Sequence, residues 1–313
     1  MNKKLISIVT PCLNEENNIA KVYEKVKEIF KKKSIYEYEH IFIDNKSNDD
    51  SVNILRQIAQ SDKNVKVILN SRNFGQWASP FYALQQCSGD AAILLVADLQ
   101  DPVELIIKFL EHWEEGYKTV IGVKINTDGS KISFNIRKIF YKTINKFSNV
   151  DLYENFMGFG LYDKDVLKKL KYFNDPEPYL RGIIADINLK VKKVEYTHLK
   201  RISGKTKNDI TSLIDMGLTS FTAYSKSPLR LITIFAFFFA AISFSIGFFY
   251  LIYKLFFWFT FDTGIAPLII LISIFFSFIF IFLGIIAEYL NSINQKTNHR
   301  LLVVEEERIN FKD

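Results

Sequence analysis

Two long apolar runs in the C-terminal part of the chain constrain its fold more than any other feature of the sequence. Leu229 to about Phe257 and Ile265 to about Ala287 are almost unbroken Leu, Ile, Phe and Ala. Each run reaches the roughly 20 residues with which an α-helix crosses a bilayer. A pair of buried core helices is the alternative, but such helices seldom run so far without a charged face. The sequence therefore predicts two transmembrane helices, which form an anchor over residues 229–290.

The charges beside these runs predict an orientation. Basic residues lie at the outer ends of the two runs: Lys226, Arg230, Lys296 and Arg300. The connection between the runs has only Lys254, near its boundary, opposed by Asp262. Cytoplasmic segments carry the excess of lysine and arginine, and Met1–Pro11 is too short for the apolar core of a secretion signal. We therefore expect a multi-pass protein of the inner (cytoplasmic) membrane, with both termini and most of the chain in the cytoplasm.

The formal net charge of +6 is modest but concentrated ahead of the first apolar run. Seven basic residues fall in one short stretch: Lys190, Lys192, Lys193, Lys200, Arg201, Lys205 and Lys207. Anionic lipid is the favoured partner of this stretch, and a solvated charged face is the alternative. We expect no nucleic-acid partner, because the stretch adjoins the predicted anchor. Residues 131–147 and 209–225 are amphipathic and are predicted to lie on the membrane surface, the second within an interfacial segment 208–228.

Short apolar runs alternate with amphipathic stretches over the N-terminal two thirds of the chain. Strands are predicted at Leu5–Pro11, His40–Asp44, Val65–Leu69, Ala91–Ala97, Thr119–Val123 and Lys190–Tyr196, and helices at Asn17–Phe30 and Asp49–Ala59. This alternation predicts βαβ units and an α/β domain, residues 1–207, with a mostly parallel sheet covered on both faces. Arg300–Phe311 is expected to form a polar tail within a cytoplasmic segment 291–313. Cys12 and Cys87 are expected to be reduced thiols.

Polar clusters follow four of the predicted strands, at the ends where parallel sheets bind ligands. They are Thr10-Pro11-Cys12-Leu13-Asn14-Glu15-Glu16, Asp44-Asn45-Lys46-Ser47, Asn70-Ser71-Arg72-Asn73-Phe74-Gly75 and Ala97-Asp98-Leu99-Gln100-Asp101-Pro102. Any one of them alone is equally well a strand-to-helix turn, with Asn14 or Asn48 as a cap and Pro102 as the first helical residue. Together and in this order, they resemble the nucleotide-sugar fold of family-2 glycosyltransferases, called GT-A.

The resemblance is closer still to the polyprenyl phosphate branch of that family, which includes dolichyl phosphate mannose synthases and bacterial undecaprenyl phosphate sugar transferases. The phrases Ser71–Gly75 and Ala97–Pro102, with Arg201–Lys207 ahead of the anchor, carry it. It implies transfer of one sugar, with inversion, from a nucleotide sugar to a polyprenyl phosphate at the cytoplasmic face of a bilayer. Relatives in this branch can assemble as homo-oligomers. The sugar carried is left open.

The departing nucleoside diphosphate develops negative charge, which calls for a divalent cation held by hard oxygen ligands. By resemblance Asp98 is the catalytic residue and, with Gln100, binds Mg²⁺ or Mn²⁺. The first acidic position of the family's metal motif is Val96 here, and the loss of that carboxylate should weaken metal binding more than abolish it.

The resemblance also assigns residues to the nucleotide. Asp44 and Asn45 would contact base and ribose, with uridine as the favoured base, since the amide oxygen of Asn45 can accept from a uracil N–H. The other wall of the site and its neighbours would be Pro11, Leu13, Asn14, Glu15, Arg72 and Gln76. A structural salt bridge is the alternative for Arg72.

A lipid phosphate requires fixed positive charge close to the bilayer. Arg201 and Lys207 lie in a segment that resembles the family's basic loop, and Arg137 lies in the amphipathic stretch 131–147. We expect these three residues to bind the acceptor phosphate, with an ordinary surface charge as the alternative for Arg137.

The chain departs from its relatives at Gly158-Phe159-Gly160, where many carry Gly-Asp-Phe-Arg. No general base can be assigned there, but a phosphate monoester, with a second pKa of about 6, is already mostly ionised near neutral pH. The departure therefore favours a phosphate acceptor over an alcohol. Two alternatives stay open: the glycines serve a close approach of strands, or the chain is a catalytically weak or inactive membrane scaffold on the same fold.

Overall fold

The computed structural model describes most of the N-terminal domain and part of the C-terminal region. The described residues are 3–126, 152–173, 175, 178–197, 199, scattered positions between 235 and 257, 265–297 and 301–311. The chain divides into two compact units, the first comprising residues 1–142, 150–213 and 299–313 and the second residues 143–149 and 214–298. The predicted surface stretches 131–147 and 209–225, and most of the first apolar run, lie outside the described residues.

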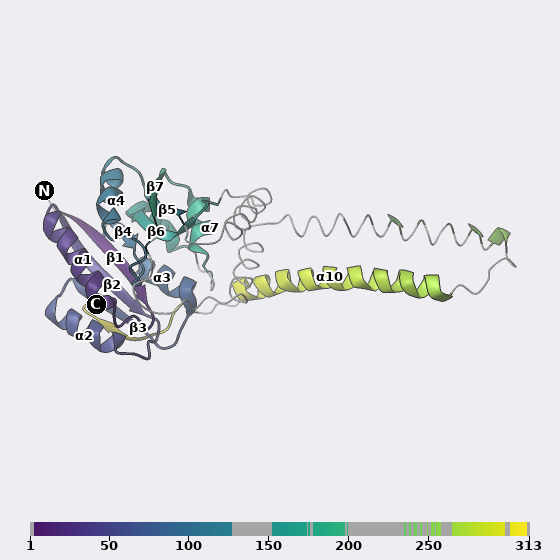
Figure 1. Ribbon diagram of the computed structural model, residues 1–313, viewed down its shortest axis with the longest axis horizontal. Helices are drawn as coiled ribbons and strands as arrows, with labels where there is room; N and C mark the ends of the chain where they lie inside the picture. The colour runs from purple at the N-terminus through teal and green to yellow at the C-terminus, as the bar shows by residue number, and fades with distance from the viewer. Residues whose placement is uncertain are drawn as a thin grey trace. The chain divides into compact units, whose positions relative to one another are not determined.

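An eight-stranded sheet forms the centre of the first unit, with strand order β7-β5-β6-β4-β1-β2-β3-β8 (Figure 1). Its strands are β1 (Lys4–Cys12), β2 (Tyr36–Asp44), β3 (Val65–Asn70), β4 (Ala91–Leu94), β5 (Thr119–Asn126), β6 (Phe156–Asp163), β7 (Val191–Thr197) and β8 (Glu305–Ile309). β6 runs antiparallel to β4 and β5, β8 runs antiparallel to β3, and the remaining pairs are parallel. The predicted mostly parallel α/β sheet is confirmed.

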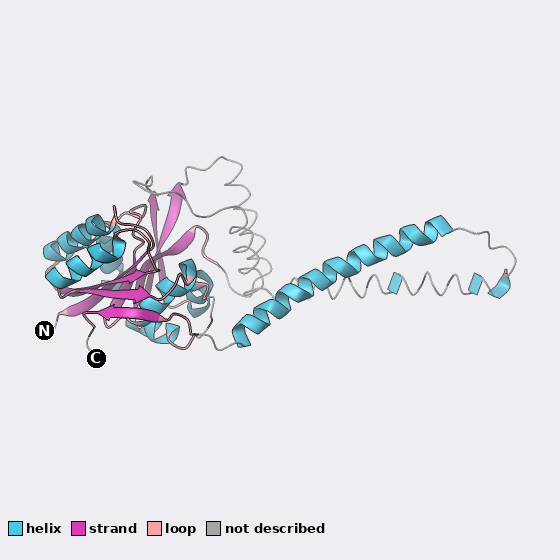
Figure 2. Cartoon of the chain, turned by 90° about the horizontal axis from the view of Figure 1, so that it is seen from below, coloured by secondary structure: helices cyan, strands magenta, loops and turns pink. Residues whose placement is uncertain are grey.

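Helices cover both faces of this sheet (Figure 2). They are α1 (Ile19–Lys32), α2 (Ser51–Ser61), α3 (Gly75–Gln85), α4 (Leu105–Glu114), α6 (Lys164–Leu170) and α7 (Leu180–Ile187). α1, α2 and α4 share buried clusters with one face, whereas α3, α6 and α7 contact one another and the strands. α1 shows the reason for such packing, because its buried residues recur every three or four positions and form one apolar stripe.

The central strands are buried at nearly every position, as expected of parallel strands covered on both sides. Ile6 and Ile8 of β1 pack with Val26 of α1 and Phe109 of α4 in one cluster. Full burial of side chains of this size contributes about 1.5–3 kcal/mol each. This apolar layer holds the strand ends, and hence the loops that follow them, at fixed spacing.

The sequence pattern does not predict β6, and the structure gives the reason. Gly160 of β6 lies so close to β5 that a Cβ there would be 2.5 Å from the carbonyl oxygen of Val120. Gly158 has a φ of +103°, which side chains other than glycine rarely adopt. The alternative of a strand glycine at a close approach is thus confirmed for Gly160, whereas Gly158 is required by its backbone conformation. Because glycines weaken the sequence signal of a strand, the pattern hides β6.

The expected polar tail is a second departure. Residues Glu305–Ile309 form β8, the yellow strand at the edge of the sheet beside β3 (Figure 1). Exposed and half-buried side chains alternate along it, and three of its five residues are glutamates. Charged side chains are common on edge strands, because they oppose pairing with other chains. The same charges give the segment the composition of a tail, so the expectation of a tail is wrong for these residues.

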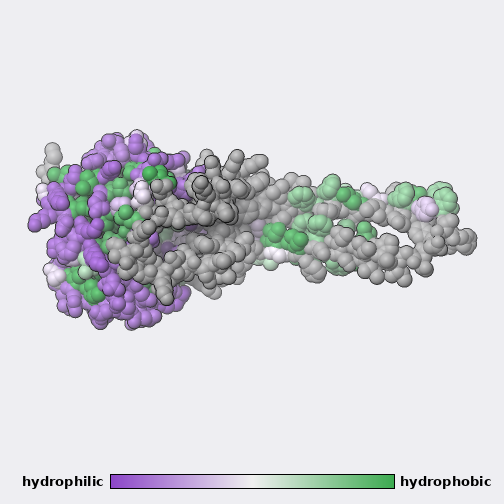
Figure 3. Space-filling view, viewed as in Figure 1, coloured by the Kyte–Doolittle hydropathy of each residue, from purple (hydrophilic) through white to green (hydrophobic). Residues whose placement is uncertain are grey.

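The second unit contains one long helix, α10 (Ile265–Thr297), which begins where the second apolar run begins and continues past Ala287. Large apolar side chains are exposed along it, including Leu268, Phe276, Leu283 and Leu290. Figure 3 shows hydrophobic residues in green over this part of the chain. Within the described residues, no helix satisfies both the length and the hydropathy expected of a membrane span. The anchor therefore stays a prediction from the sequence.

Candidate active site

The candidate site lies at the carboxyl edge of the sheet, defined here as the edge where β1, β2, β3 and β4 end. The strand order turns at β1, because β2 and β3 follow on one side of it and β4 pairs on the other. Open α/β sheets bind ligands at such a turning point. The four polar clusters follow these four strands, so the topology brings all of them to one edge (Figure 1).

Hydrogen bonds join the loops after β1 and β2. The backbone N–H of Asn14 donates to Ser47 Oγ at 2.8 Å, and the Asn14 side-chain oxygen accepts from the backbone N–H of Asn48 at 2.8 Å. Glu15 N–H donates to Ser51 Oγ at 3.0 Å. Asn14 thus joins two loops instead of capping a helix, and α1 begins later, after Asn18. Leu13 and Pro11 are half-buried in the same wall.

Asp44 is buried at the end of β2 and shapes its own loop. Its Oδ1 accepts from the backbone N–H of Ser47 at 2.9 Å, and its Oδ2 accepts from Ser47 Oγ at 2.5 Å. Burial raises the pKa of the Asp44 carboxyl, and the bonds from Ser47 offset part of that rise. The adjacent Cys12 is a free thiol, and burial raises its pKa well above the usual value. Reduced thiols agree with the sequence analysis.

Asn45 links the second loop to the third. Its side-chain oxygen accepts from Phe74 N–H at 2.8 Å, from Ser79 Oγ at 2.9 Å and from Asn70 Nδ2 at 3.1 Å. Its amide nitrogen donates to Asn73 Oδ1 at 2.8 Å and to the carbonyl oxygen of Gly75 at 3.1 Å. These bonds use both polar atoms of the side chain. The structure therefore gives Asn45 a role in holding the Asn70–Gly75 loop, and its contact with a base stays a prediction.

Arg72 and Gln76 are exposed on the third loop and the start of α3. The Arg72 guanidinium lies 3.9 Å from the ring centroid of Phe74, and its Nη1 donates to the carbonyl oxygen of Asn73 at 3.2 Å. No ion pair of Arg72 occurs within the described residues. Stacking on Phe74 fixes the direction of the guanidinium. An exposed guanidinium held in this way is compatible with the predicted contact to a nucleotide.

Asp98 is half-buried in the loop after β4, and its Oδ1 accepts from Gln100 N–H at 3.1 Å. The residues on either side hold this loop to the core: Ala97 packs with the ends of β1 and β3, and Leu99 is buried with α1 and α4. Leu99 has a φ of +56°, which is uncommon for leucine and strains the backbone. Both neighbours are directed inward, so the Asp98 carboxylate is the group that the turn presents at the edge.

A left-handed residue occurs in each of the four loops. They are Asn14, Lys46, Gly75 and Leu99, with φ between +56° and +86°. Left-handed backbone costs about 1–2 kcal/mol for residues other than glycine and persists where the surrounding structure fixes it. The repeated conformation marks these loops as preformed.

Asp101 fixes the far side of the Asp98 loop. Its buried carboxylate accepts from Tyr196 Oη at 2.5 Å and lies 3.8 Å from Lys124 Nζ. Burial raises the pKa of Tyr196, and the negative charges of Asp101 and Asp98 raise it further. Pro102 lies outside α4, which begins at Leu105. The sequence analysis missed this cluster, because nothing in the local pattern relates Asp101 to a tyrosine on β7.

Gln100 joins the fourth loop to the chain that follows β7. Leu199 N–H donates to the carbonyl oxygen of Gln100 at 2.9 Å, and Gln100 Nε2 donates to the carbonyl oxygen of Leu199 at 3.4 Å. Leu199 precedes the basic segment that contains Arg201 and Lys207. Those two residues and Arg137 lie outside the described residues, and Leu199 itself lies beside the predicted metal loop.

The start of β6 reaches the same edge. A Cβ added at Gly158 would contact Leu94 at the end of β4 and Leu180 at the start of α7. Nη1 of Arg181 lies 3.3 Å from Met157 Sδ, which places a guanidinium beside the segment that lacks the family's carboxylate. Sequence reasoning missed Arg181, and its only signal was a basic residue at the start of an amphipathic helix.

The side chains at the edge suit a divalent cation in part. Asp98 offers a carboxylate and Gln100 an amide oxygen, both hard ligands, and the Gln100 nitrogen is the atom that donates to Leu199. Within the described part of the chain, no group of three or more His, Cys, Asp or Glu could hold a metal. Mg²⁺ typically uses one or two protein carboxylates and takes its remaining ligands from phosphates and water. The residues therefore fit a cation that binds together with a diphosphate.

These features define a class of protein: an α/β domain of the GT-A type, with its ligand loops at the carboxyl edge. The family model for glycosyl transferase family 2 matches residues 7–171. The chain belongs to this family, and it is a glycosyltransferase.

Several curated relatives match over most of their length. The bactoprenol glucosyl transferase of Shigella phage SfV is 32% identical over 305 residues, which cover 94% of this chain and 96% of that protein. The uncharacterized glycosyltransferase YkcC of Bacillus subtilis (strain 168) is 31% identical over 299 residues, 95% and 92% of the two chains. A prophage bactoprenol glucosyl transferase homolog of Escherichia coli (strain K12) is 35% identical over 244 residues, 77% and 79% of the two chains.

A solved structure has a similar fold. It is glucosyl-3-phosphoglycerate synthase from Mycobacterium tuberculosis in complex with Mn²⁺, UDP and glucosyl-3-phosphoglycerate. The likeness covers 70% of this chain and 78% of that chain, with a TM-score of 0.50 and 18% sequence identity. It supports the GT-A fold.

Proposed function

We propose that this glycosyltransferase moves one hexose from a uridine diphosphate sugar to a polyprenyl phosphate. The observation that carries the proposal is the pairing of Gln100 with Leu199, the residue that lies two positions before Arg201 in the sequence. The donor diphosphate would bind at the Asp98 loop, and the acceptor phosphate would bind to the basic residues that follow Leu199 in the sequence. The names of the phage and prophage relatives support the same acceptor and favour glucose as the first sugar to test.

The reaction balances without a general base. A phosphate oxygen of the acceptor forms a bond to the anomeric carbon as the bond from that carbon to the donor diphosphate breaks. The diphosphate leaves with the electron pair, and the anomeric carbon is inverted. Because a phosphate monoester is largely ionised at neutral pH, the attacking oxygen has no proton to lose. This chemistry accounts for an active enzyme in which glycines occupy the segment Gly158–Gly160.

The residues of the chain hold and orient the two substrates. The joined loops after β1 and β2, with Asp44 and Glu15, would bind the nucleoside, and Arg72 and Gln76 would lie beside it. Arg137, Arg201 and Lys207 would hold the acceptor phosphate. Asp98 and Gln100 would hold Mg²⁺ or Mn²⁺ against the diphosphate, where the cation offsets the charge that develops on the leaving group.

We further propose that residues 229–290 anchor the enzyme in the inner membrane, with the sheet domain on the cytoplasmic side. The two apolar runs and the basic residues at their outer ends support this location. Exposed leucine and phenylalanine side chains along α10 agree with a lipid environment. A reporter fused after Phe311 checks the orientation, since it should be protected from protease in spheroplasts and accessible in inverted vesicles. The opposite pattern would overturn it.

A donor and acceptor panel tests the activity. The full-length chain in detergent is incubated with labelled UDP-glucose, UDP-N-acetylglucosamine or GDP-mannose and with either undecaprenyl phosphate or undecaprenol. We expect a lipid-linked sugar from a uridine donor and undecaprenyl phosphate only, and we expect excess chelator to suppress it. Product from undecaprenol would reject the phosphate acceptor, and full activity in chelator would reject the metal role of Asp98. No product from any pair would favour the scaffold alternative, which Val96 and Gly158 motivate.

A further inference from the structure

The last strand of the chain reaches the candidate site. β8 runs antiparallel to β3, with Glu305 opposite Asn70, so β8 begins at the carboxyl edge. Val304 and Glu306 therefore lie at the level of the loops after β2 and β3. This placement follows from the antiparallel pairing and is independent of the assignments made by resemblance.

Two contacts connect this end of β8 to those loops. The Glu306 carboxylate forms an ion pair with Nζ of Lys46, the left-handed residue that follows Asn45. Ser71 N–H donates to the carbonyl oxygen of Val304 at 2.9 Å, directly before Arg72. Both loops are thus held from outside by β8, and from inside by the hydrogen bonds of Asn45.

Further contacts hold β8 along its length and at Asn310, the residue that follows it. Asn310 Nδ2 donates to the carbonyl oxygens of Ala59 and Val65 at 2.6 and 2.8 Å. Arg308 contacts Gln86 at the end of α3 at 3.0 Å and also pairs with Glu305. Glu307 pairs with Arg56 of α2, away from the loops. These contacts fix the strand in place, so that Glu306 and Val304 can act as a rigid support.

We propose that β8 positions the donor-binding loops, with Glu306 as a positioning residue for the nucleotide. This inference rests on the proposed function, because it assumes that the loops after β2 and β3 bind the donor. Glu306 holds the Lys46 side chain against the sheet edge and fixes the left-handed turn that follows Asp44 and Asn45. Without the ion pair, the turn samples other conformations, and the nucleotide must select the competent one.

The structure offers a matched control for this proposal. Glu306 and Glu307 are neighbours on the same strand, and each pairs with one cation at the surface. The Glu306 and Glu307 side chains are similarly exposed, at 55% and 41%, and so are Lys46 and Arg56, at 48% and 44%. Only the Glu306 pair involves a donor loop. A purely structural role of β8 predicts similar effects for both residues.

The test compares Glu306→Gln with Glu307→Gln in the full-length enzyme, using UDP-glucose and undecaprenyl phosphate. For Glu306→Gln we expect the donor KM to rise about two- to fivefold, the range of a single exposed ion pair, with kcat and the acceptor KM unchanged. For Glu307→Gln we expect no change in any of the three. The double variant Lys46→Glu with Glu306→Lys reverses the ion pair. Its donor KM should return most of the way to the wild-type value.

Thermal unfolding of both variants separates positioning from loss of fold. Their melting temperatures should fall by similar small amounts. A donor KM that stays at the wild-type value in both variants, or that rises equally in both, would overturn the positioning role. The proposed function would stand as long as the wild-type enzyme forms product. If the wild type formed no product, the proposed function itself would fail. In that case, calorimetry of UDP binding tests the inference. We expect UDP to bind Glu306→Gln more weakly than Glu307→Gln, and equal binding to both variants would refute the positioning role.

Discussion

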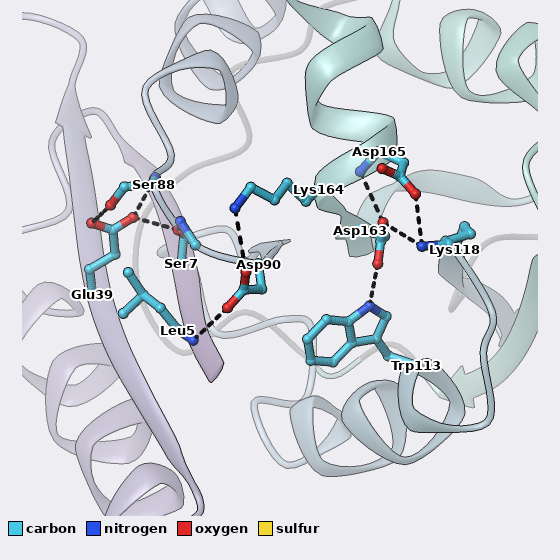
Figure 4. Close-up of polar contacts among 11 residues, drawn as sticks. Leu5, Ser7, Glu39, Ser88, Asp90, Trp113, Lys118, Asp163, Lys164 and Asp165 are labelled. Carbon is cyan, nitrogen blue, oxygen red and sulfur yellow. Dashed lines mark hydrogen bonds and ion pairs between the residues drawn. The ribbon is translucent and has the colours of Figure 1, made fainter. Parts of the chain in front are cut away.

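At the amino edge of the sheet, opposite the candidate site, buried carboxylates meet fixed cations and hydroxyls, whereas at the carboxyl edge Asp44, Asn45 and Asp98 accept hydrogen bonds from the loops themselves. Glu39 shows the first arrangement: its carboxylate accepts from Ser7 Oγ at 2.5 Å and from Ser88 N–H at 2.8 Å (Figure 4). It also accepts from Lys66 Nζ at 2.5 Å. Burial alone would raise the pKa of Glu39, but these bonds lower it overall.

A second group at the amino edge repeats this arrangement. Asp163 accepts from Trp113 Nε1 at 2.7 Å and from Lys118 Nζ at 3.0 Å, and Lys118 also pairs with Asp165 (Figure 4). Asp90 accepts from Leu5 N–H at 3.1 Å. Each acid joins elements that are far apart in sequence, so these groups stabilise the fold.

The carboxyl edge differs in the partners of its polar side chains. Asp44 and Asn45 shape loops, while Asp98 is half-buried at the turn with a backbone N–H as one partner. The same residue types thus stabilise the fold where a lysine is fixed nearby, and shape the loops at the carboxyl edge. Single substitutions at the two edges should separate these roles.

The largest expected effect is on activity at the carboxyl edge. Asp98→Asn should lower kcat about a hundred- to a thousandfold, because an amide replaces the charged metal ligand. Its melting temperature should stay close to wild type, since the new amide oxygen can still accept from Gln100 N–H. Asp90→Asn is the same change at the amino edge and should keep nearly full activity. Comparable losses in the two variants would contradict the division between the edges.

The converse effect is expected at Glu39. Glu39→Ala should lower the free energy of unfolding by about 3 kcal/mol, because Lys66 and two serines lose a buried partner. Urea denaturation measures this loss, and kcat per folded molecule should be unchanged. Glu37→Ala, on an exposed position of the same strand, should cost less than about 0.5 kcal/mol. A fall in kcat at full folding would show that the edges are coupled.

The pH dependence of stability gives a third test. His40 of β2 is fully buried, with its Nε2 2.9 Å from Thr10 Oγ1 of β1, and burial lowers its pKa to about 3. The unfolded chain binds a proton at this residue below a pH of about 6.5, but the folded chain does not until a pH of about 3. Stability is therefore lost as the pH falls from about 6.5 towards about 3.

For His40 we expect a loss of about 2 kcal/mol between pH 7 and pH 5. His40→Gln should remove this component, because glutamine does not titrate and can keep a bond to Thr10. Urea denaturation at both pH values measures the difference. An unchanged pH slope in the variant would assign the acid sensitivity elsewhere. The lowered pKa of Glu39 adds a loss of stability only as the pH falls below about 4.5, outside the interval between pH 7 and pH 5.

The smallest effect is expected at Asn45. Asn45→Asp replaces the amide by a carboxylate, which cannot donate to Asn73 Oδ1 or to the carbonyl oxygen of Gly75. We expect a loss of about 1–2 kcal/mol in stability and a higher donor KM. Asn17→Asp, at an exposed position before α1, serves as the control and should leave both unchanged. A lower donor KM for Asn45→Asp would instead support direct contact with the nucleotide.

Much of this architecture could be read from the sequence. The buried runs of β1 to β5 and the amphipathic pattern of α1 and α2 are local signals, and the observed elements lie within a few residues of the predicted ones. The order of the four polar clusters was also sufficient to predict that they share one edge. Gly158 and Gly160 hid β6, because the close packing that requires glycine removes the side chains that mark a strand.

The sequence by itself determined the strands β1 to β5 and β7, the helices α1 and α2, the mostly parallel sheet and the position of Asp98 after β4, because periodicity and strand-end composition are local properties. Only the tertiary structure decided that Asn45 holds a loop, that Asp101 pairs with Tyr196 on β7, and that the polar C-terminal residues return as β8 beside Lys46. These pairings join residues separated by up to 260 positions. Such contacts depend on which strands become neighbours, and no local pattern encodes that choice.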